Sequence, residues 1–122
     1  MKISVCITTF NSKEFIEDCL KSVRFADEII VVDHESIDGT QEIVKKYTKN
    51  VFIQENNPDK IDVQKNFGFQ KASHEWVLSL DADERVTPEL TEEIKKVITG
   101  SSDIAGFRIP RKNIIFGKWI QH

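Results

Sequence analysis

Short apolar runs alternate with helix-like segments along most of this chain, and this alternation is the feature that most restricts its fold. The runs are four or five residues long, and they lie at residues 3–7, 28–32, 51–54 and 76–80. Runs of this length and composition predict buried strands. Strands that alternate with helices at this spacing form right-handed βαβ units. The sequence therefore predicts an α/β fold with a mostly parallel central sheet.

Two of the intervening segments begin with the spacing of a helix capping box. In this motif a short polar side chain stands three residues before a Glu or Gln, and each satisfies a backbone amide near the other. Asn11 and Glu14 have this spacing, and so do Asp38 and Gln41. We therefore expect Asn11 and Asp38 to cap helices, the first of which should end near Arg24.

Two further helices and another strand are expected later in the chain. Residues 61–72 have apolar residues on or near one side, and Pro88 stands in the first turn of a helix that Gly100 ends. Residues 107–110 alternate like the start of a strand. Because Pro110 cannot donate a hydrogen bond to a neighbouring strand, we expect this strand at an edge of the sheet.

The composition indicates one globular domain and excludes some classes of protein. A chain of 122 residues suits a single domain with a core of its own. Its net charge of -3 argues against a general nucleic-acid-binding protein, which would carry a basic stripe. Cys6 and Cys19 have no second pair at metal-ligand spacing, so we expect reduced thiols in the core of a cytosolic protein. The first apolar run is too short for a signal peptide or a membrane span, and no transmembrane segment is expected.

Polar residues follow three of the predicted strands at the point where each strand ends. They are residues 8–11, residues 33–36, and the pair Asp81 and Asp83 with Glu84 beside it. Open α/β sheets bind their ligands at the carboxyl ends of their strands. Carboxylates there suit Mg²⁺ or Mn²⁺, ions that often share a site between protein carboxylates and substrate phosphates. The pattern predicts a metal-diphosphate site. Taken alone, however, an acidic pair of this spacing is common and favours a solvated turn before a helix.

Five segments stand in a characteristic order along the chain: ITTFN at 7–11, IIVVD at 29–33, SIDGT at 36–40, KNFG at 65–68 and LDAD at 80–83. In this order and spacing they resemble the amino-terminal half of an inverting family-two glycosyltransferase. The resemblance implies the GT-A fold, a Rossmann-like three-layer sandwich, as one domain over residues 1–122. Residues 81–90, followed by 107–111, are also similar to a bacterial subgroup that adds sugars to the lipopolysaccharide core.

The resemblance assigns roles to residues at the strand ends. The nucleotide-binding residues that it implies are Thr8, Thr9, Phe10, Asn11, Asp33, Lys65, Asp81 and Ala82. Asp33 would accept a hydrogen bond from a uracil ring N–H, and Lys65 would pair with the diphosphate as a point charge. Asp83, with Asp81, would bind a divalent metal, Mn²⁺ or Mg²⁺, that stabilises the departing nucleoside diphosphate.

Structural roles are the alternatives for several of these residues. Asn11 could be a helix cap, Asp33 a turn residue, and Lys65 part of a solvated helix face. Asp38 and Thr40 are interpreted as structural, because the cap spacing explains them without a ligand. Many relatives have Asp-Gly-Ser where this chain has residues 34–36, His-Glu-Ser, so the local loop geometry is expected to differ.

The function implied by the resemblance is sugar transfer. The donor would be a nucleotide-sugar, with a UDP-sugar expected, and the acceptor a saccharide or lipid-linked molecule in cell-envelope polysaccharide or lipopolysaccharide synthesis. Such an enzyme would be cytoplasmic, at the inner face of the membrane, and peripheral association with that membrane is expected. The apolar segment around Trp119 could pair two copies as a homodimer.

The general base is the part of the chemistry that the sequence does not supply. Inverting transfer needs a base to deprotonate the acceptor hydroxyl, and in the family this carboxylate comes from later in the chain. Here nothing after Asp103 is acidic, and a terminal residue such as His122 is a poorly held base. We therefore expect a fragment, incomplete at its carboxyl end, that binds a nucleotide and transfers sugar weakly or not at all.

Three other classes remain as alternatives. A non-catalytic nucleotide-binding module would fit the missing base. A phosphoacceptor receiver domain also has acidic strand ends, but gathers them after its first and third strands. A nucleotidyltransferase usually has a Gly-rich basic loop after the first strand, where this chain has residues 8–11, TTFN.

Overall fold

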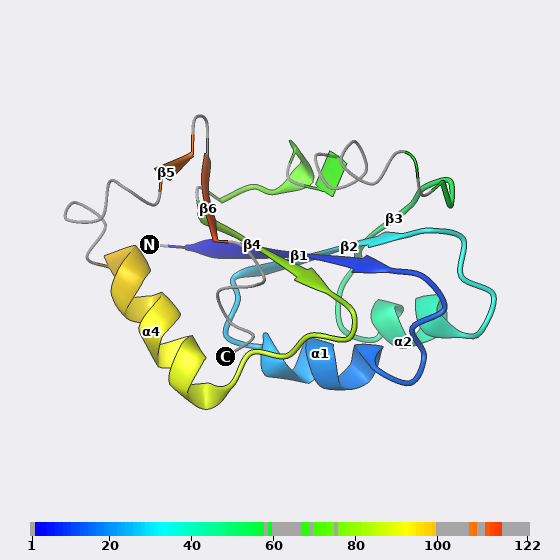
Figure 1. Cartoon of the computed structure of the whole chain (residues 1–122), viewed down its shortest axis with the longest axis horizontal. Helices are drawn as coiled ribbons and strands as arrows, with labels where there is room; N and C mark the ends of the chain where they lie inside the picture. The colour runs from blue at the N-terminus through cyan, green and yellow to red at the C-terminus, as the bar shows by residue number, and fades with distance from the viewer. Residues whose placement is uncertain are drawn as a thin grey trace.

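A central sheet organises the fold (Figure 1). The computed structural model describes residues 2–57, 59, 67–68, 70–74, 76–99, 108–109 and 112–115. Within them a six-stranded sheet has the order β3-β2-β1-β4-β6-β5. Its strands are β1 (Ile3–Thr9), β2 (Glu28–Asp33), β3 (Asn50–Ile53), β4 (Trp76–Asp81), β5 (Arg108–Ile109) and β6 (Lys112–Ile115).

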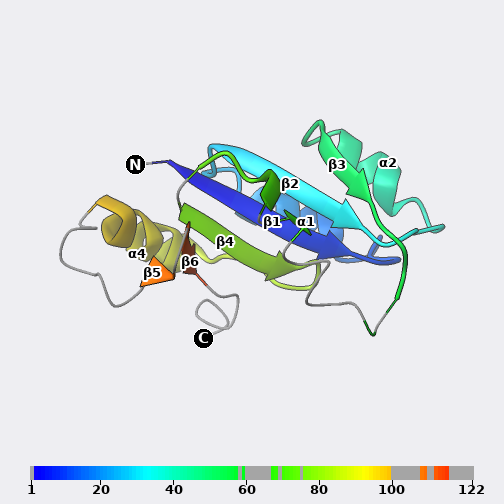
Figure 2. The same cartoon turned by 90° about the horizontal axis from the view of Figure 1, so that it is seen from above.

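The strands run mostly parallel, as predicted. β1 lies between β2 and β4 and is parallel to both, while β3 and β6 extend the parallel sheet on either side. Only β5, within the described sheet, is antiparallel to its neighbour. The arrowheads of β1, β2 and β4 point the same way in Figure 2, so these strands end at one rim of the sheet. We call it the carboxyl rim.

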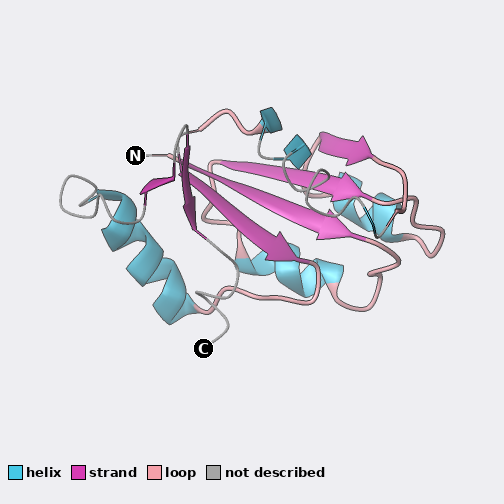
Figure 3. Cartoon of the chain, turned by 45° about the horizontal axis from the view of Figure 1, so that its top comes forward, coloured by secondary structure: helices cyan, strands magenta, loops and turns pink. Residues whose placement is uncertain are grey.

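Helices cover both faces of the sheet. Helices α1 (Ile16–Ser22), α2 (Thr40–Lys45) and α4 (Pro88–Thr99) lie on one face (Figure 3), which we call the α1 face. Residues 67–68 and 70–71 are helical on the opposite face, the Gly68 face, where the thiol of Cys6 donates to the carbonyl oxygen of Gly68 over 3.4 Å. Helix, sheet and helix form the predicted three-layer α/β sandwich.

The main core lies between the sheet and the α1 face. Helix α1 contributes Ile16, Cys19 and Leu20, spaced three and four residues apart so that they share one side of the helix. Val44 of α2 and Ile94 of α4 join the same cluster. A second cluster on the Gly68 face contains Cys6, Ile30, Ala72 and Val77. Because β1 is buried against both layers, its sequence is a continuous apolar run rather than an alternating one.

The predicted elements are found with shifted boundaries. β1, β2 and β4 each extend one or two residues past the apolar run, to Thr9, Asp33 and Asp81. The edge strand expected at 107–110 corresponds to β5, at the end of the sheet. The predicted helix at 61–72 lies mostly outside the described residues. β6 was not predicted from the sequence; it pairs with β4. Trp119 also lies outside the described residues.

The predicted cap at Asn11 is wrong, whereas Asp38 does bond to the start of its helix. Helix α1 follows Phe15 and helix α2 follows Gly39, and neither Phe15 nor Gly39 provides a side-chain cap. Asn11 is left-handed, with φ of 45°, and its side chain accepts from the amide of Ile37 instead. Asp38 accepts from the amide of Thr40, the first residue of α2, and from the amide of Lys13 in the loop after β1. Asn11 bonds across the two loops instead of capping a helix, and the spacing of the motif cannot distinguish these two roles.

Both cysteines are buried free thiols, as expected for a reduced core. Burial, together with the nearby carboxylates of Glu84, Asp83 and Asp81, raises the pKa of the Cys19 thiol to about 12. Cys19 is therefore an inert core residue rather than a nucleophile. Among the helices that the structure describes, none is long and apolar enough to cross a membrane.

Candidate functional site

Polar side chains from three strands meet at the carboxyl rim. Thr8 and Thr9 end β1, Asp33 ends β2 and Asp81 ends β4. Two cross-strand hydrogen bonds connect them. Thr8 Oγ1 donates to Asp81 Oδ1 over 3.1 Å, and Thr9 Oγ1 donates to Asp33 Oδ1 over 2.5 Å. The expected meeting of the three strand ends is confirmed.

The two hydrogen-bonded pairs lie on different faces of the sheet, because successive side chains of a strand alternate between its faces. Thr9 and Asp33 lie on the α1 face, where they are 2% and 0% exposed. Thr8 and Asp81 lie on the Gly68 face, and Asp81 is exposed. Of these two pairs, the one on the Gly68 face is open to a ligand.

Asp33 is fully occupied by donors of its own chain. Oδ1 accepts from the hydroxyls of Thr9 and Ser36, and Oδ2 accepts from the amide of Ser36 and the side chain of Gln41. Burial alone would raise the pKa of Asp33, but the hydrogen bonds from Ser36, Thr9 and Gln41 outweigh it and lower that pKa. These contacts describe an ionised carboxylate that organises a turn, while its predicted contact with uracil stays a prediction.

The acidic segment after β4 is a tight turn whose carboxylates face outward. The amide of Asp81 donates to Glu84 Oε1 over 2.8 Å, and the amide of Glu84 donates to the carbonyl oxygen of Asp81 over 3.0 Å. Ala82 packs into the main core and is 6% exposed. Asp83 is exposed and makes no hydrogen bond or ion pair with the described part of the chain. The turn thus presents Asp83 to solvent and holds Asp81 at the end of its strand.

The chemistry of Asp81 and Asp83 fits a hard divalent cation. Two carboxylates with one residue between them supply oxygen ligands, which Mg²⁺ and Mn²⁺ prefer. No group of three or more His, Cys, Asp or Glu side chains able to hold a metal occurs among the described residues. Mg²⁺ bound by one or two protein carboxylates usually completes its coordination with substrate phosphates and water.

A set of hydrogen bonds joins the loop after β1 to the loop after β2. The amide of Asn11 donates to Ser36 Oγ over 2.7 Å, and the side-chain oxygen of Asn11 accepts from the amide of Ile37 over 2.9 Å. The amide of Lys13 donates to Asp38 Oδ2 over 3.1 Å. Asn11 and Asp38 thus hold the two loops together, which agrees with the structural role assigned to Asp38.

The remaining predicted site residues have different positions and contacts in the structure. Phe10 follows β1 and is 48% exposed, so its ring is available at the rim. Thr40 donates its hydroxyl to Asp38 and accepts from the amide of Ser12, which supports the structural interpretation. Lys65 lies outside the described residues, and its predicted contact with the diphosphate stays a prediction.

Sequence reasoning missed the residues that surround the predicted ones. Ser36 and Gln41 provide three of the four donors to Asp33, and Glu84 closes the acidic turn. Ser36 stood within a family-like segment, and its offset of three residues from Asp33 is that of a turn. The contact between Gln41 and Asp33 could not be predicted from their spacing in the sequence, because it depends on where α2 packs.

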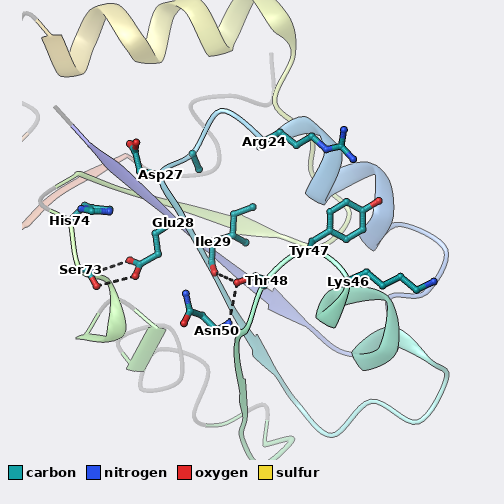
Figure 4. A pocket seen from close by; sticks show the side chains of 11 residues that line it. Arg24, Asp27, Glu28, Ile29, Lys46, Tyr47, Thr48, Asn50, Ser73 and His74 are labelled. Atoms are coloured by element: carbon teal, nitrogen blue, oxygen red, sulfur yellow. Dashed lines mark hydrogen bonds between the residues drawn. The ribbon is translucent and has the colours of Figure 1, made fainter.

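A polar groove of about 650 Å³ lies at the opposite, amino-terminal ends of the strands (Figure 4). Its own groups satisfy one another: Ser73 donates to Glu28, and Thr48 donates to the carbonyl oxygen of Ile29. None of the predicted site residues lines this groove. The candidate site is the carboxyl rim.

The glycosyl transferase family 2 profile matches residues 4–122. The chain belongs to glycosyltransferase family 2. It is 28% identical to the lipopolysaccharide core biosynthesis glycosyltransferase LpsC of Rhizobium meliloti, over 96% of this chain and 44% of LpsC. It is 39% identical to an uncharacterized glycosyltransferase of Rickettsia prowazekii, over 80% of this chain and 33% of that protein. The chain thus spans less than half the length of these relatives.

Solved structures of Staphylococcus aureus TarS share the fold. The crystal structure of Staphylococcus aureus TarS 1-349 in complex with UDP matches with a TM-score of 0.68 and 31% identity, over 82% of this chain and 32% of that one. The complex with UDP-GlcNAc matches with a TM-score of 0.65 and 30% identity, over the same shares. These matches confirm the GT-A fold that the sequence motifs implied.

Proposed function

We propose that the protein is a glycosyltransferase that binds a UDP-sugar at the carboxyl rim and transfers the sugar, with inversion and with the help of a divalent metal. The observation that carries this proposal is the acidic turn at Asp81 and Asp83, on the same rim as Thr8 and Asp33. The similarity to TarS in complex with UDP and with UDP-GlcNAc supports the choice of nucleotide.

The roles at the acidic turn follow from its hydrogen bonds. The hydroxyl of Thr8 fixes one oxygen of Asp81, so that this carboxylate meets the ribose or the metal from a set position. Asp83 has no partner in the described part of the chain and is exposed, so its carboxylate is free to bind a cation. A bound Mg²⁺ or Mn²⁺ would act as a Lewis acid toward the departing diphosphate.

The acceptor is proposed from the relatives. LpsC is named for lipopolysaccharide core biosynthesis and TarS for transfer of N-acetylglucosamine to poly(ribitol-phosphate). We therefore propose a saccharide or lipid-linked acceptor of the cell envelope. A lipid-linked acceptor would place the protein at the cytoplasmic face of the membrane.

No general base is assigned among the described residues. Asp33 is buried and committed to four hydrogen bonds, and Asp81 and Asp83 are assigned to the donor. We expect this chain alone to bind nucleotide but to transfer sugar weakly or not at all. Robust turnover by the chain alone would contradict that expectation.

Calorimetric titration tests the proposal. UDP, GDP and ADP are titrated with and without Mn²⁺ into the wild type, Asp83→Ala and Glu92→Ala. We expect UDP to bind most tightly and to need the metal. Asp83→Ala should weaken metal-dependent binding of UDP roughly tenfold or more, because a metal ligand is lost.

Glu92→Ala is the matched control, because it removes one exposed carboxylate from α4, outside the acidic turn. It should leave UDP binding unchanged. Equal binding by wild type and Asp83→Ala in the presence of Mn²⁺ would exclude the role of Asp83. Metal-dependent UDP binding without transfer by the full-length protein would favour the non-catalytic module.

A further inference from the structure

Helix α1 holds the segment that follows the acidic turn. The hydroxyl of Ser22, the last residue of α1, accepts from the amide of Val86 over 3.0 Å and donates to the carbonyl oxygen of Cys19 over 2.7 Å. Arg85 forms an ion pair of 3.0 Å with Asp18. Because Asp18 and Ser22 are four residues apart, they lie on one side of the helix. That side of α1 therefore binds two consecutive residues of the segment between β4 and α4, which passes beside α1 in Figure 1.

The two contacts differ in strength. The side chains of Arg85 and Asp18 are 61% and 52% exposed, and an ion pair in solvent contributes little to stability. Ser22 is half-buried and Val86 is only 4% exposed. An amide at such a position is costly to leave without an acceptor. The hydroxyl of Ser22 is therefore the stronger of the two attachments.

Asp83 lies between two fixed points of the backbone. Before it, Asp81 pairs with β1 in the sheet and its carboxylate accepts from Thr8. After it, Val86 is buried in the main core and its amide is bound by Ser22. Asp83 itself makes no hydrogen bond or ion pair within the described residues. Its position therefore depends on how firmly the backbone is held on either side.

We propose that Ser22 is a positioning residue for the metal site: through the amide of Val86 it fixes the backbone of the turn from which Asp83 binds the cation. The inference rests on the proposed function, because it assumes that Asp83 binds a divalent metal together with UDP. Ser22 belongs to the helix layer and acts through the turn, not by contact with the metal. A ligand that is already held in place loses less conformational freedom on binding, so loss of this hydroxyl should weaken metal binding.

The test measures the Mn²⁺ concentration that gives half-maximal UDP binding to the full-length protein, by calorimetry at a fixed UDP concentration. Ser22→Ala should raise this concentration about threefold to tenfold, as expected when a hydrogen bond that supports a metal ligand is lost. Ser22→Thr keeps the hydroxyl, which in a helix can still donate to the carbonyl oxygen three residues back, and should restore the wild-type value. Ser22→Cys has a weaker hydrogen-bonding group and should give an intermediate increase. It also keeps the test decisive if the alanine variant does not fold.

Thr48→Val is the matched control. The hydroxyl of Thr48 also connects two backbone groups, since it donates to the carbonyl oxygen of Ile29 over 2.7 Å and accepts from the amide of Asn50 over 3.1 Å. Thr48 is half-buried like Ser22, but it lines the groove at the amino-terminal ends of the strands. Its loss should lower stability in urea unfolding and leave the Mn²⁺ requirement unchanged. An equal increase in both variants would mean a general loss of stability and would overturn the inference.

Hydrogen exchange without metal or nucleotide tests the positioning directly. The amides of Asp81 and Glu84 close the acidic turn. They should exchange faster in Ser22→Ala than in the wild type, and at the wild-type rate in Thr48→Val. Unchanged exchange of these amides, or an unchanged Mn²⁺ requirement, in Ser22→Ala would overturn the inference and leave the proposed function intact. A wild type without Mn²⁺-dependent UDP binding would overturn both.

Discussion

Asp33 and Asp83 are carboxylates at the same rim of the same sheet, yet their surroundings are opposite. Asp33 is completely buried and accepts four hydrogen bonds from the chain. Asp83 is exposed and has no partner in the described part of the chain. The first side chain has all its hydrogen bonds before any ligand arrives, and the second has none.

The comparison shows that position at a strand end does not by itself make a residue a ligand-binding one. The face of the sheet and the number of internal donors decide which carboxylate is available. Asp33 lies on the α1 face against α2, where Gln41 reaches it. Asp83 follows Ala82, whose burial in the core turns its neighbours outward. Replacing each residue should therefore affect a different property.

Asp33→Ala should have the largest effect on stability. It leaves the donors of Thr9, Ser36 and Gln41 without their acceptor in a buried site, which should cost about 3 kcal/mol. Asp83→Ala should change stability by less than about 0.5 kcal/mol, as expected for an exposed residue without partners. Urea unfolding of both variants measures the difference. Equal losses of stability would contradict the contrast between the two sites.

The fold could be predicted from the sequence because its signals are local and periodic. The apolar runs of β1, β2 and β4 are buried against both layers, so each is readable without knowledge of its neighbours. β6 was not predicted, because its own residue pattern does not indicate a strand of the central sheet. Its position beside β4 follows from its antiparallel pairing with β5. The strand ends that form the rim could be predicted for the same local reason.

The roles of single residues were harder to predict, because they depend on which face a strand end presents. The family-like motif placed Asp33 at the rim, but its four donors come from three separate segments. Glu35 shows the opposite case. The resemblance to the family implied Gly at its position, and Glu35 has a left-handed conformation with φ of 61°. The loop thus retains the shape that glycine favours.

Asn11 tests whether exposure or hydrogen bonding makes a rim residue structural, because it is exposed like Asp83 and bonded like Asp33. Asn11→Ala removes the acceptor for the amide of Ile37 and places alanine at a φ of 45°. We expect a loss of about 1–2 kcal/mol in urea unfolding. Asn11→Gly loses the acceptor but tolerates the backbone conformation, so it should cost less. A glycine variant less stable than the alanine one would contradict this.

Acid should reduce the contribution of Asp33 to the stability of the fold, because the pKa of Asp33 is lowered in the folded protein. An aspartate in the unfolded chain has a pKa of about 3.9, and that of Asp33 is lower in the folded protein. The stabilisation that this difference gives is present above about pH 4 and is lost as the pH falls through the folded pKa. The stability difference between wild type and Asp33→Asn should therefore shrink from about pH 7 to about pH 3 in urea unfolding. Contributions from Glu28 and Asp38 cancel in that difference. A constant difference would contradict the assignment.

Thr8→Val should have the smallest effect, and it probes the side of the comparison that is open to ligand. Its hydroxyl donates to Asp81 at an exposed position, where water can replace the lost partner, so stability should change by less than about 1 kcal/mol. Without that hydrogen bond Asp81 is less well positioned for the metal and the ribose, and UDP binding with Mn²⁺ should weaken about threefold.

Thr9→Val is the matched control, because its hydroxyl donates to Asp33 on the α1 face. That variant should lose more stability and less metal-dependent affinity than Thr8→Val. The two neighbouring threonines therefore test which face of the sheet binds the ligand. The reverse outcome would mean that the ligand approaches the α1 face, and it would contradict the role assigned to Asp81.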